Sequence, residues 1–188
     1  MLSYFDLRRG VRFIYEGQPY EVLEFRQMGK AQHVVVAQTK IRNLLTGNVF
    51  ERNFHKAETF EEADIEKVPV KFIYERRGVY VFAEEENPSR RFEMDKEKIG
   101  EQVKFLKPNE IVEGLRFQGE IINVTLPIKV QLKVAEAPPG IKGDRSQGGT
   151  KTVVLETGAS VNVPLFIEQD DLVEINTETG EYARRVQE

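Results

Sequence analysis

The sequence predicts an all-β protein built from three small β-barrels in series. Its apolar residues fall in short runs of alternating polarity, separated by turn-forming residues. The pattern stops and restarts twice, after a polar acidic stretch at 58–64 and at Pro127. The length of 188 residues is enough for two or three small domains. We therefore expect domains at residues 1–64, 65–127 and 128–188.

The first third predicts an SH3-like, or KOW-like, barrel. A Glu16-Gly17-Gln18 turn separates its first strands, and a polar break from Arg26 to Gln32 separates the next two. Gly29 accepts a positive φ without steric cost, so we expect a hairpin with Lys30 at its tip. A Gly-Lys tip is also ordinary turn chemistry, so the tip alone leaves open whether it has a function. The strands expected here span residues 11–15, 19–25, 33–37 and 49–54.

The middle section predicts a five-stranded oligonucleotide/oligosaccharide-binding (OB) barrel with one helix. Asp95 can cap a helix that runs to Leu106, because Ile99, Val103 and Leu106 follow at the spacing of one helix face. A turn at Arg76-Arg77-Gly78 separates the first two strands. The expected strands are 68–74, 79–82, 110–112 and 120–124.

The last section predicts a third β module. A polar, glycine-rich loop at 138–149 interrupts it, and its glycines fit neither the Walker nor the dinucleotide spacing. The loop is either a long connection or an RNA contact, in which Lys142 and Arg145 offer charge and Asp144 offers hydrogen bonds. A hairpin turn is expected at Thr179-Gly180. The expected strands are 130–135, 153–155, 160–167, 172–175 and 182–186.

Composition excludes several classes of function. The chain has no cysteine, which rules out disulfides, thiolate zinc sites and cysteine nucleophiles and fits a cytoplasmic address. No apolar run approaches the roughly 20 residues of a membrane span, and no signal peptide begins the sequence, so we expect no membrane partner. His33 and His55 have no second histidine at ligand spacing, and no carboxylate pair predicts acid–base chemistry. We expect no enzyme, no cofactor and no metal.

Charge is uneven along the chain. The net charge is −4, but residues 1–60 carry nine Lys or Arg against six Asp or Glu. A basic first third suits contact with phosphate. Its cations lie near Phe13, Tyr15 and Phe54, a combination that fits RNA phosphates and unpaired bases, although such aromatics also form cores. The candidate RNA-binding cations are Arg8, Arg9, Arg12, Lys40, Arg42, Arg52 and Lys56.

Five motifs occur along the chain in a specific order. They are the Gly29-Lys30 hairpin, the run Lys40–Gly47, the loop Pro139–Asp144, the run Thr157–Ile167 and Gly180-Glu181-Tyr182. Together they closely resemble bacterial translation elongation factor P from end to end. The run Thr157–Ile167, which contains Val-Pro-Leu-Phe, is the most specific of the five.

The resemblance implies a fold and an activity. It implies an SH3-like first domain and two OB-fold barrels, arranged as an L with the outline of transfer RNA. Such a factor binds the ribosome between the peptidyl and exit sites, positions peptidyl-tRNA and stimulates peptide-bond formation, which relieves stalling at consecutive prolines. It acts as a monomer. The expected partners are both ribosomal subunits, peptidyl-tRNA, mRNA at the exit site and a lysine-modifying enzyme.

The resemblance also assigns residues. Lys30, beside Gly29, would lie near the terminal adenosine of peptidyl-tRNA, and the seven cations of the first domain would face that tRNA. Tyr182 and Arg185 would contact the small subunit. The residues that would approach the exit-site codon are Lys142, Gly143, Asp144, Arg145, Gly148 and Gly149.

Two departures from the family pattern concern the tip. Met28 and Ala31 stand where many members have Pro and Gly, and the segment from Lys30 to Lys40 is longer than usual. Related factors carry a β-lysyl or aminopentanol group on the lysine or leave it bare, and the sequence leaves this open for Lys30. A general single-stranded RNA-binding or chaperone protein and an elongation factor P paralogue with different clients are the alternative functions.

Overall fold

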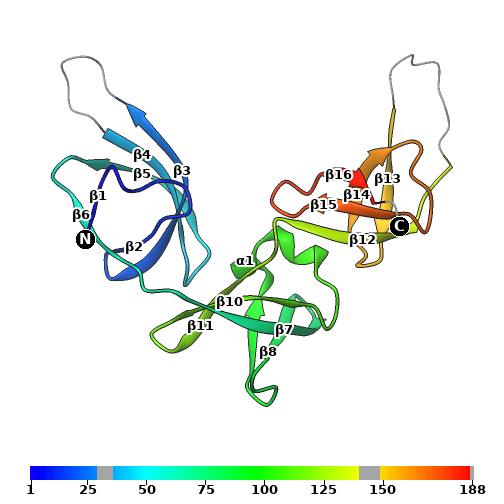
Figure 1. Cartoon of the computed structure of the whole chain (residues 1–188), viewed down its shortest axis with the longest axis horizontal. Coiled ribbons are helices and arrows are strands. Elements are labelled where there is room, and N and C mark those ends of the chain that lie inside the picture. Colours follow the sequence, from blue (N-terminus) through cyan, green and yellow to red (C-terminus); the bar gives the residue numbers. More distant parts are fainter. Residues whose placement is uncertain (29–35, 140–148, 187–188) are drawn as a thin grey trace. The chain divides into compact units, whose positions relative to one another are not determined.

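The fold is seen in a computed structural model that describes residues 1–28, 36–139 and 149–186 (Figure 1). Strands dominate the described residues and form three sheets, as predicted. In strand order these are β1-β6-β2-β3-β4-β5, then β11-β10-β7-β8-β9, then β14-β13-β12-β15-β16. Among the described residues no helix is long and apolar enough to cross a membrane.

The first sheet surrounds an aromatic core. Its rings meet edge to face: Phe13 lies 5.8 Å from Phe54 and 5.2 Å from Phe60, between centroids. Phe13 and Phe54 are fully buried, and such pairs add stabilisation beyond the area that they bury. The strands are β1 (Leu2–Ser3), β2 (Arg12–Tyr15), β3 (Gln18–Met28), β4 (Val36–Asn43), β5 (Val49–His55) and β6 (Thr59–Glu62).

Strand β3 is longer than the sequence predicts. The polar break was expected to begin at Arg26, but β3 continues to Met28, which pairs with Val36 of β4. The prediction of a break there was wrong because backbone pairing with β4 continues where the side chains are polar and exposed. The rest of the expected break and the expected strand residues 33–35 lie outside the described residues.

The acidic stretch at 58–64, taken as a boundary signal, contains a strand. Strand β6 pairs with both β1 and β2, and Phe60 is buried while Glu61 and Glu62 are exposed. Alternation places Phe60 in the core and leaves the adjacent Glu61 in water, and the exposed Glu62 ends the strand. This stretch therefore completes the first sheet.

The second sheet carries a row of aromatic side chains and one short helix. Phe82 stacks on Phe92 at 5.5 Å and also packs 5.5 Å from Phe72. The strands are β7 (Glu66–Arg76), β8 (Val79–Glu84), β9 (Arg91–Asp95), β10 (Ile111–Phe117) and β11 (Glu120–Thr125).

The helix predicted from Asp95 to Leu106 is divided in two. Helix α1 spans Lys96–Ile99, and the 3-10 helix η1 spans Glu101–Phe105. The prediction of one continuous helix was wrong because Gly100 adopts φ +97° and ends α1. Asp95 makes no side-chain capping bond. The apolar spacing was nevertheless informative, since Ile99, Val103 and Leu106 are buried.

The third sheet has its own apolar core. Leu132, Val134, Val163 and Ile175 are fully buried in it, and Phe105 of η1 belongs to the same cluster. The strand expected at 160–167 ends at Pro164, where a turn closed by the Ile167 amide and the Pro164 carbonyl begins. The strands are β12 (Lys129–Glu136), β13 (Thr150–Leu155), β14 (Ser160–Pro164), β15 (Leu172–Asn176) and β16 (Tyr182–Arg185).

The chain divides into two compact units, and the second sheet supplies residues to both. The first unit comprises residues 1–69, 94–100 and 113–124, and the second comprises 70–93, 101–112 and 125–188.

In the first unit, the turn between β4 and β5 packs against α1. Asn43 shapes the turn, since its side-chain oxygen accepts the Leu45 and Thr46 amides at 2.8 and 3.0 Å. Gly47 has φ +80°, and a β-carbon there would lie 3.1 Å from backbone atoms of Glu97 and Lys98. Only a glycine meets both conditions.

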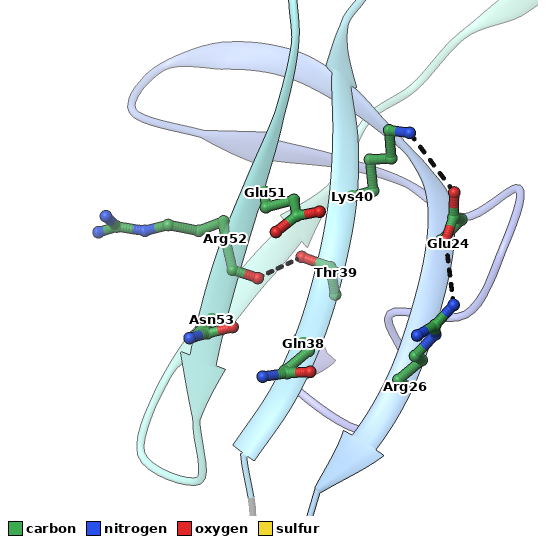
Figure 2. Close-up of a pocket in the computed structure, with 8 residues that line it drawn as sticks. All are labelled: Glu24, Arg26, Gln38, Thr39, Lys40, Glu51, Arg52 and Asn53. Atoms are coloured by element: carbon green, nitrogen blue, oxygen red, sulfur yellow. Dashed lines mark hydrogen bonds and ion pairs between the residues drawn. The ribbon is translucent and has the colours of Figure 1, made fainter.

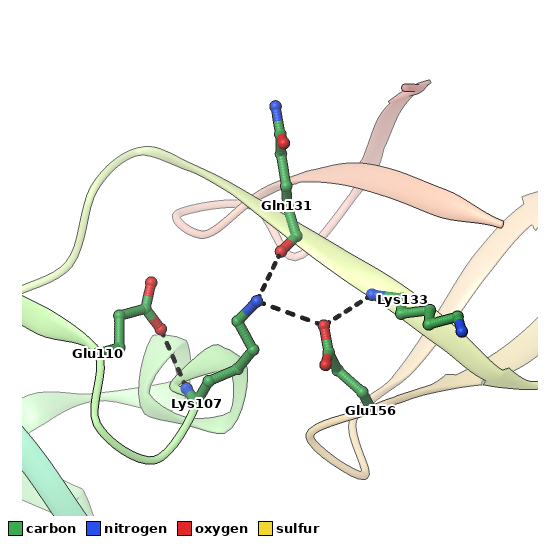
Figure 3. Close-up of polar contacts among 5 residues, drawn as sticks. All are labelled: Lys107, Glu110, Gln131, Lys133 and Glu156. Carbon is green, nitrogen blue, oxygen red and sulfur yellow. Dashed lines mark hydrogen bonds and ion pairs between the residues drawn. The ribbon is translucent and has the colours of Figure 1, made fainter. Parts of the chain in front are cut away.

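In the second unit, Lys107 ties the segment after η1 to strand β12 (Figure 3). Its ammonium donates to the Gln131 carbonyl at 3.3 Å and to Glu156 Oε1 at 3.4 Å. The same Glu156 oxygen accepts the Lys133 amide at 2.8 Å. At the other end, the Lys107 amide donates to Glu110 at 3.0 Å. With Phe105 in the apolar cluster, these bonds fix this segment to the third sheet.

We predict that Gly47→Ala destabilises the protein more than Gly10→Ala does. Gly10 also has a positive φ, +87°, but a β-carbon there would meet nothing within 4 Å. Both variants lose about 1 kcal/mol to backbone strain, and Gly47→Ala loses a further 1–3 kcal/mol, roughly, to overpacking against α1. Urea unfolding followed by circular dichroism measures the difference. Equal losses would mean that the turn does not press on α1.

Candidate functional site

The segment that contains Lys30 connects two paired strands. Met28 of β3 lies opposite Val36 of β4, so residues 29–35 join the ends of adjacent strands. Gly29 and Lys30 themselves lie outside the described residues. The pairing at the base of this segment agrees with the hairpin that the sequence predicts.

Three strands reach that base together. Val36 is flanked by Met28 on one side and by His55 of β5 on the other. One face of this ribbon is anchored, because Ala37 and Phe54 are almost completely buried, whereas Met28 is 56% exposed. From Val22, in the core, to Met28 the ribbon extends about 20 Å at the usual strand rise.

The exposed face of the ribbon holds a polar groove of about 570 Å³, which we term the β3–β5 groove (Figure 2). Every side chain that lines it is polar or charged. In Figure 2, Gln38 and Asn53 lie next to each other on neighbouring strands, and Lys40 and Arg26 both approach Glu24. The lining residues are Glu24, Arg26, Gln38, Thr39, Lys40, Glu51, Arg52 and Asn53.

Positively and negatively charged side chains lie next to each other in the groove. The Lys40 ammonium lies 3.5 Å from Glu24, and the Arg26 guanidinium lies 3.9 Å from the same carboxylate. Glu51 is the cross-strand partner of Lys40 on the other side. Lys40 and Glu24 are about half exposed and Arg26 is 79% exposed, so each pair contributes between zero and about 1 kcal/mol and can open to a stronger anion.

Nearer the core, Arg12 and Arg42 share the groove's face of the sheet. Both are cross-strand partners of Glu21. The Arg12 guanidinium lies 3.8 Å from Glu21, and the two side chains are only 19% and 23% exposed. Arg12 therefore helps to hold β2 against β3, and its charge is largely engaged within the sheet.

Arg52 turns away from the other cations. Its guanidinium lies 5.6 Å from the ring centre of Tyr15, and Figure 2 shows it extended away from Glu51. The Arg52 carbonyl accepts the buried Thr39 hydroxyl at 2.8 Å. Burial, followed by a hydrogen bond with Glu16, raises the pKa of Tyr15 above 10.0, so this ring is neutral at physiological pH.

The structure does not bring the seven predicted cations into one cluster. Lys40, Arg42 and Arg12 lie on one face of the sheet, together with their acidic partners. Arg52 leans on Tyr15, exposed Arg8 and Arg9 lie between β1 and β2, and exposed Lys56 follows β5. Arg26, which the sequence analysis missed, belongs to the groove; alternation beyond Phe25 was the available signal.

The C-terminal candidates fall into two groups. Lys142, Gly143, Asp144, Arg145 and Gly148 lie outside the described residues. Gly149 is described, and a β-carbon there would come 3.1 Å from Leu165, so the glycine leaves room for that side chain. On β16, Tyr182 packs against the third core and the Arg185 guanidinium lies 3.4 Å from Asp171.

A charged cluster beside Tyr182 was also missed. Glu174 is almost buried in β15, with Arg184 at 3.1 Å and Lys129 at 3.0 Å. The hydrogen bond from Arg184, and then that from Lys129, lowers the pKa of Glu174 below 4.5, and the pKa of Arg184 is raised in return. A single acid within the apolar run of β15 was the available signal.

Metal binding has no support in the part of the chain that the structure describes. No group of three or more His, Asp or Glu side chains there could hold an ion.

Comparison with known proteins identifies the class of this architecture. Three family profiles match in succession: "Elongation factor P (EF-P) KOW-like domain" at residues 3–60, "Elongation factor P (EF-P) OB domain" at 65–124 and "Elongation factor P, C-terminal" at 130–185. A KOW-like domain, an OB domain and an elongation factor P C-terminal domain in succession define a translation factor.

Whole-length relatives agree. The chain is 37% identical over 188 residues to elongation factor P of Thermodesulfovibrio yellowstonii, which covers 100% of both chains. It is 40% identical over 185 residues to that of Moorella thermoacetica, which covers 98% of this chain and 100% of the relative. The chain belongs to the elongation factor P family.

Among solved structures, eukaryotic translation initiation factor 5A from Methanococcus jannaschii matches with a TM-score of 0.47 at 14% identity, covering 66% of this chain and 93% of that one. The family profiles and the whole-length relatives confirm, at the level of the family, the resemblance found in the sequence. These relatives are named as elongation factors, a class distinct from classical enzymes.

We predict that Glu174→Gln lowers the thermal midpoint of the full chain at pH 7. Because the folded pKa of Glu174 is lowered, its contribution to stability is present above pH 4.5 and is lost as the pH falls through the folded pKa. The gap between wild type and variant should therefore close below that pH. Thermal unfolding between pH 3 and pH 7 measures it.

The control is Glu168→Gln, because Glu168 is exposed. This variant should match wild type throughout. A gap for Glu174→Gln that persists unchanged at pH 3 would show that the carboxylate charge is not its cause.

Proposed function

We propose that this protein binds the ribosome between the peptidyl and exit sites, positions peptidyl-tRNA and stimulates peptide-bond formation at consecutive prolines. The supporting observation is membership of the elongation factor P family over the whole chain, combined with the location of Lys30 between two paired strands. The ribbon β3–β4–β5 supplies the anchor for that segment, since Phe54 is buried beneath it.

The proposed role of Lys30 is positional. Proline is a restricted, slow nucleophile, so a displaced peptidyl-tRNA forfeits rate through poor orientation. An ammonium on a flexible four-carbon stem can hold the tRNA end by its charge without giving up a proton. Bond formation would then belong to the ribosome, and the protein would supply orientation.

The first domain would contact tRNA through its cations. Lys40 and Arg26 can exchange their solvent-exposed ion pairs with Glu24 for hydrogen bonds to phosphate, and Gln38 and Asn53 offer hydrogen bonds beside them. The remaining proposed contacts are Arg8, Arg9, Arg12, Arg42, Arg52 and Lys56. Affinity of this kind weakens steeply with salt.

The C-terminal contacts are proposed on the same grounds. Tyr182 and Arg185 would meet the small subunit, with Arg185 leaving Asp171. The loop residues Lys142, Gly143, Asp144, Arg145, Gly148 and Gly149 would approach mRNA at the exit site. The three sheets and the three profile matches support domain boundaries at 1–64, 65–127 and 128–188.

We predict that Lys30→Ala abolishes rescue of a polyproline reporter in a reconstituted translation system. Loss of orientation should slow proline–proline bond formation by about 10- to 100-fold, whereas ribosome binding should be largely retained. Circular dichroism verifies the fold.

The matched control is Lys71→Ala, which removes one lysine from the second sheet and should retain full rescue. Full rescue by Lys30→Ala would favour a general RNA-binding protein or a paralogue with other clients, since neither requires one defined cation.

A lysine-modifying enzyme is a proposed further partner. Intact mass of the protein from its native host tests this. An added mass that maps to the peptide containing Lys30 would support such an enzyme. An intact mass equal to the mass calculated from the sequence would contradict it.

A further inference from the structure

Strands β7 and β8 form a hairpin whose turn is cationic. They pair as far as Arg76 and Val79, and Arg77-Gly78 form the two-residue turn with φ +55° and +82°. Two other turns in the chain, Glu16-Gly17 and Gln118-Gly119, have the same signs of φ. In all three the second position is glycine, as this backbone favours, while the first position differs in charge. Of these three turns, the β7–β8 turn is the one with a cation, Arg77, at its first position.

The two guanidiniums at this turn are available to a partner. Arg76 and Arg77 are exposed, and within the described ranges neither side chain makes an ion pair or hydrogen bond. The adjacent acid, Glu75, is held in the turn, where its carboxylate accepts the Gly78 amide at 2.6 Å. Its cross-strand partner is Tyr80, whereas Arg76 lies opposite Val79 and so on the other face.

Apart from Glu75, the acids of β8 and of the segment after it lie at the far end of the hairpin. Glu84 ends β8, about 17 Å from Val79 at the usual strand rise, and Glu85 and Glu86 follow it. This exceeds the Debye length of about 8 Å at physiological salt, so these acids do not cancel the charge of the turn.

An exposed aromatic ring accompanies the arginines. Tyr74 is 46% exposed, and its register places it on the face of β7 that carries Arg76. Guanidiniums bind phosphate oxygens in a two-pronged geometry, and an exposed ring beside them stacks on bases. Adjacent cations beside an exposed ring are the combination with which proteins bind single-stranded nucleic acid.

We propose that the β7–β8 tip, defined as Tyr74, Arg76 and Arg77, is an RNA-contact surface of the middle sheet, with the arginines on phosphates and the tyrosine on a base. The conclusion that this RNA is ribosomal rests on the proposed function. The conclusion that the tip binds RNA rests on the side chains of the tip alone.

The test measures binding of the full-length protein to 70S ribosomes and to protein-free large-subunit ribosomal RNA. Salt is varied from about 50 to about 300 mM, because charge-dependent binding weakens over this range. For the double variant Arg76→Gln with Arg77→Gln we expect about a tenfold loss of affinity near 100 mM salt. The slope of log affinity against log salt should fall by about 2. Tyr74→Leu should weaken binding and leave the slope unchanged.

The matched control is Arg90→Gln with Arg91→Gln, which removes the same charge at the start of β9, where Arg90 lies 3.5 Å from Glu84, and should change affinity less than about twofold. A tip variant equal to wild type on both probes would overturn the inference. A photoreactive residue at position 77 should cross-link to RNA, and cross-links to protein alone would overturn the RNA assignment. Wild type that fails to bind ribosomes, with tip-dependent RNA binding intact, would instead overturn the proposed function.

Discussion

The pairing register of β3 with β4 is the constraint on which the candidate site depends. It places Ala37 and Ile41 in the core and Gln38 and Lys40 in the groove. A slip of one residue would exchange these two sets, because side chains alternate along a strand. The irregularity between Val22 and Glu24 fixes this register, since it lets the core pair Val22–Ile41 and the charged pair Glu24–Lys40 coexist.

The segment between β9 and β10 of the second sheet contributes a side chain to the apolar core of the third sheet. Phe105 belongs to a 3-10 helix of the middle section, yet it is buried in the cluster of the third sheet. Lys107, two residues later, bonds to β12 and to Glu156. The apolar anchor supplies most of the stabilisation, because burial of an aromatic ring outweighs a half-exposed ion pair.

The sequence predicted the fold class and most strands, but not the arrangement of the cations. Turns with a glycine at the second position, such as Glu16-Gly17 and Arg77-Gly78, were predicted because the backbone there requires positive φ. Strand β6 was missed because one buried Phe60 among acids is a weak signal. The helix was overextended because apolar spacing carries no information on Gly100.

For the site, composition indicated phosphate binding but could not tell which cations are engaged within the fold. The bond of Arg12 to Glu21 and the contact of Arg52 with Tyr15 depend on cross-strand neighbours far apart in sequence. Residues 140–148 of the glycine-rich loop, together with Gly29 and Lys30, lie outside the described residues, so their roles are inferred from the sequence alone.

The tight turns, together with the absence of cysteine, make the chain convenient for spectroscopy. Position 16 or 118 already holds a side chain with a β-carbon at positive φ, so a single cysteine there would add little strain and would be the sole thiol. A fluorophore at one of these positions could follow the arrival of the factor on its target in real time.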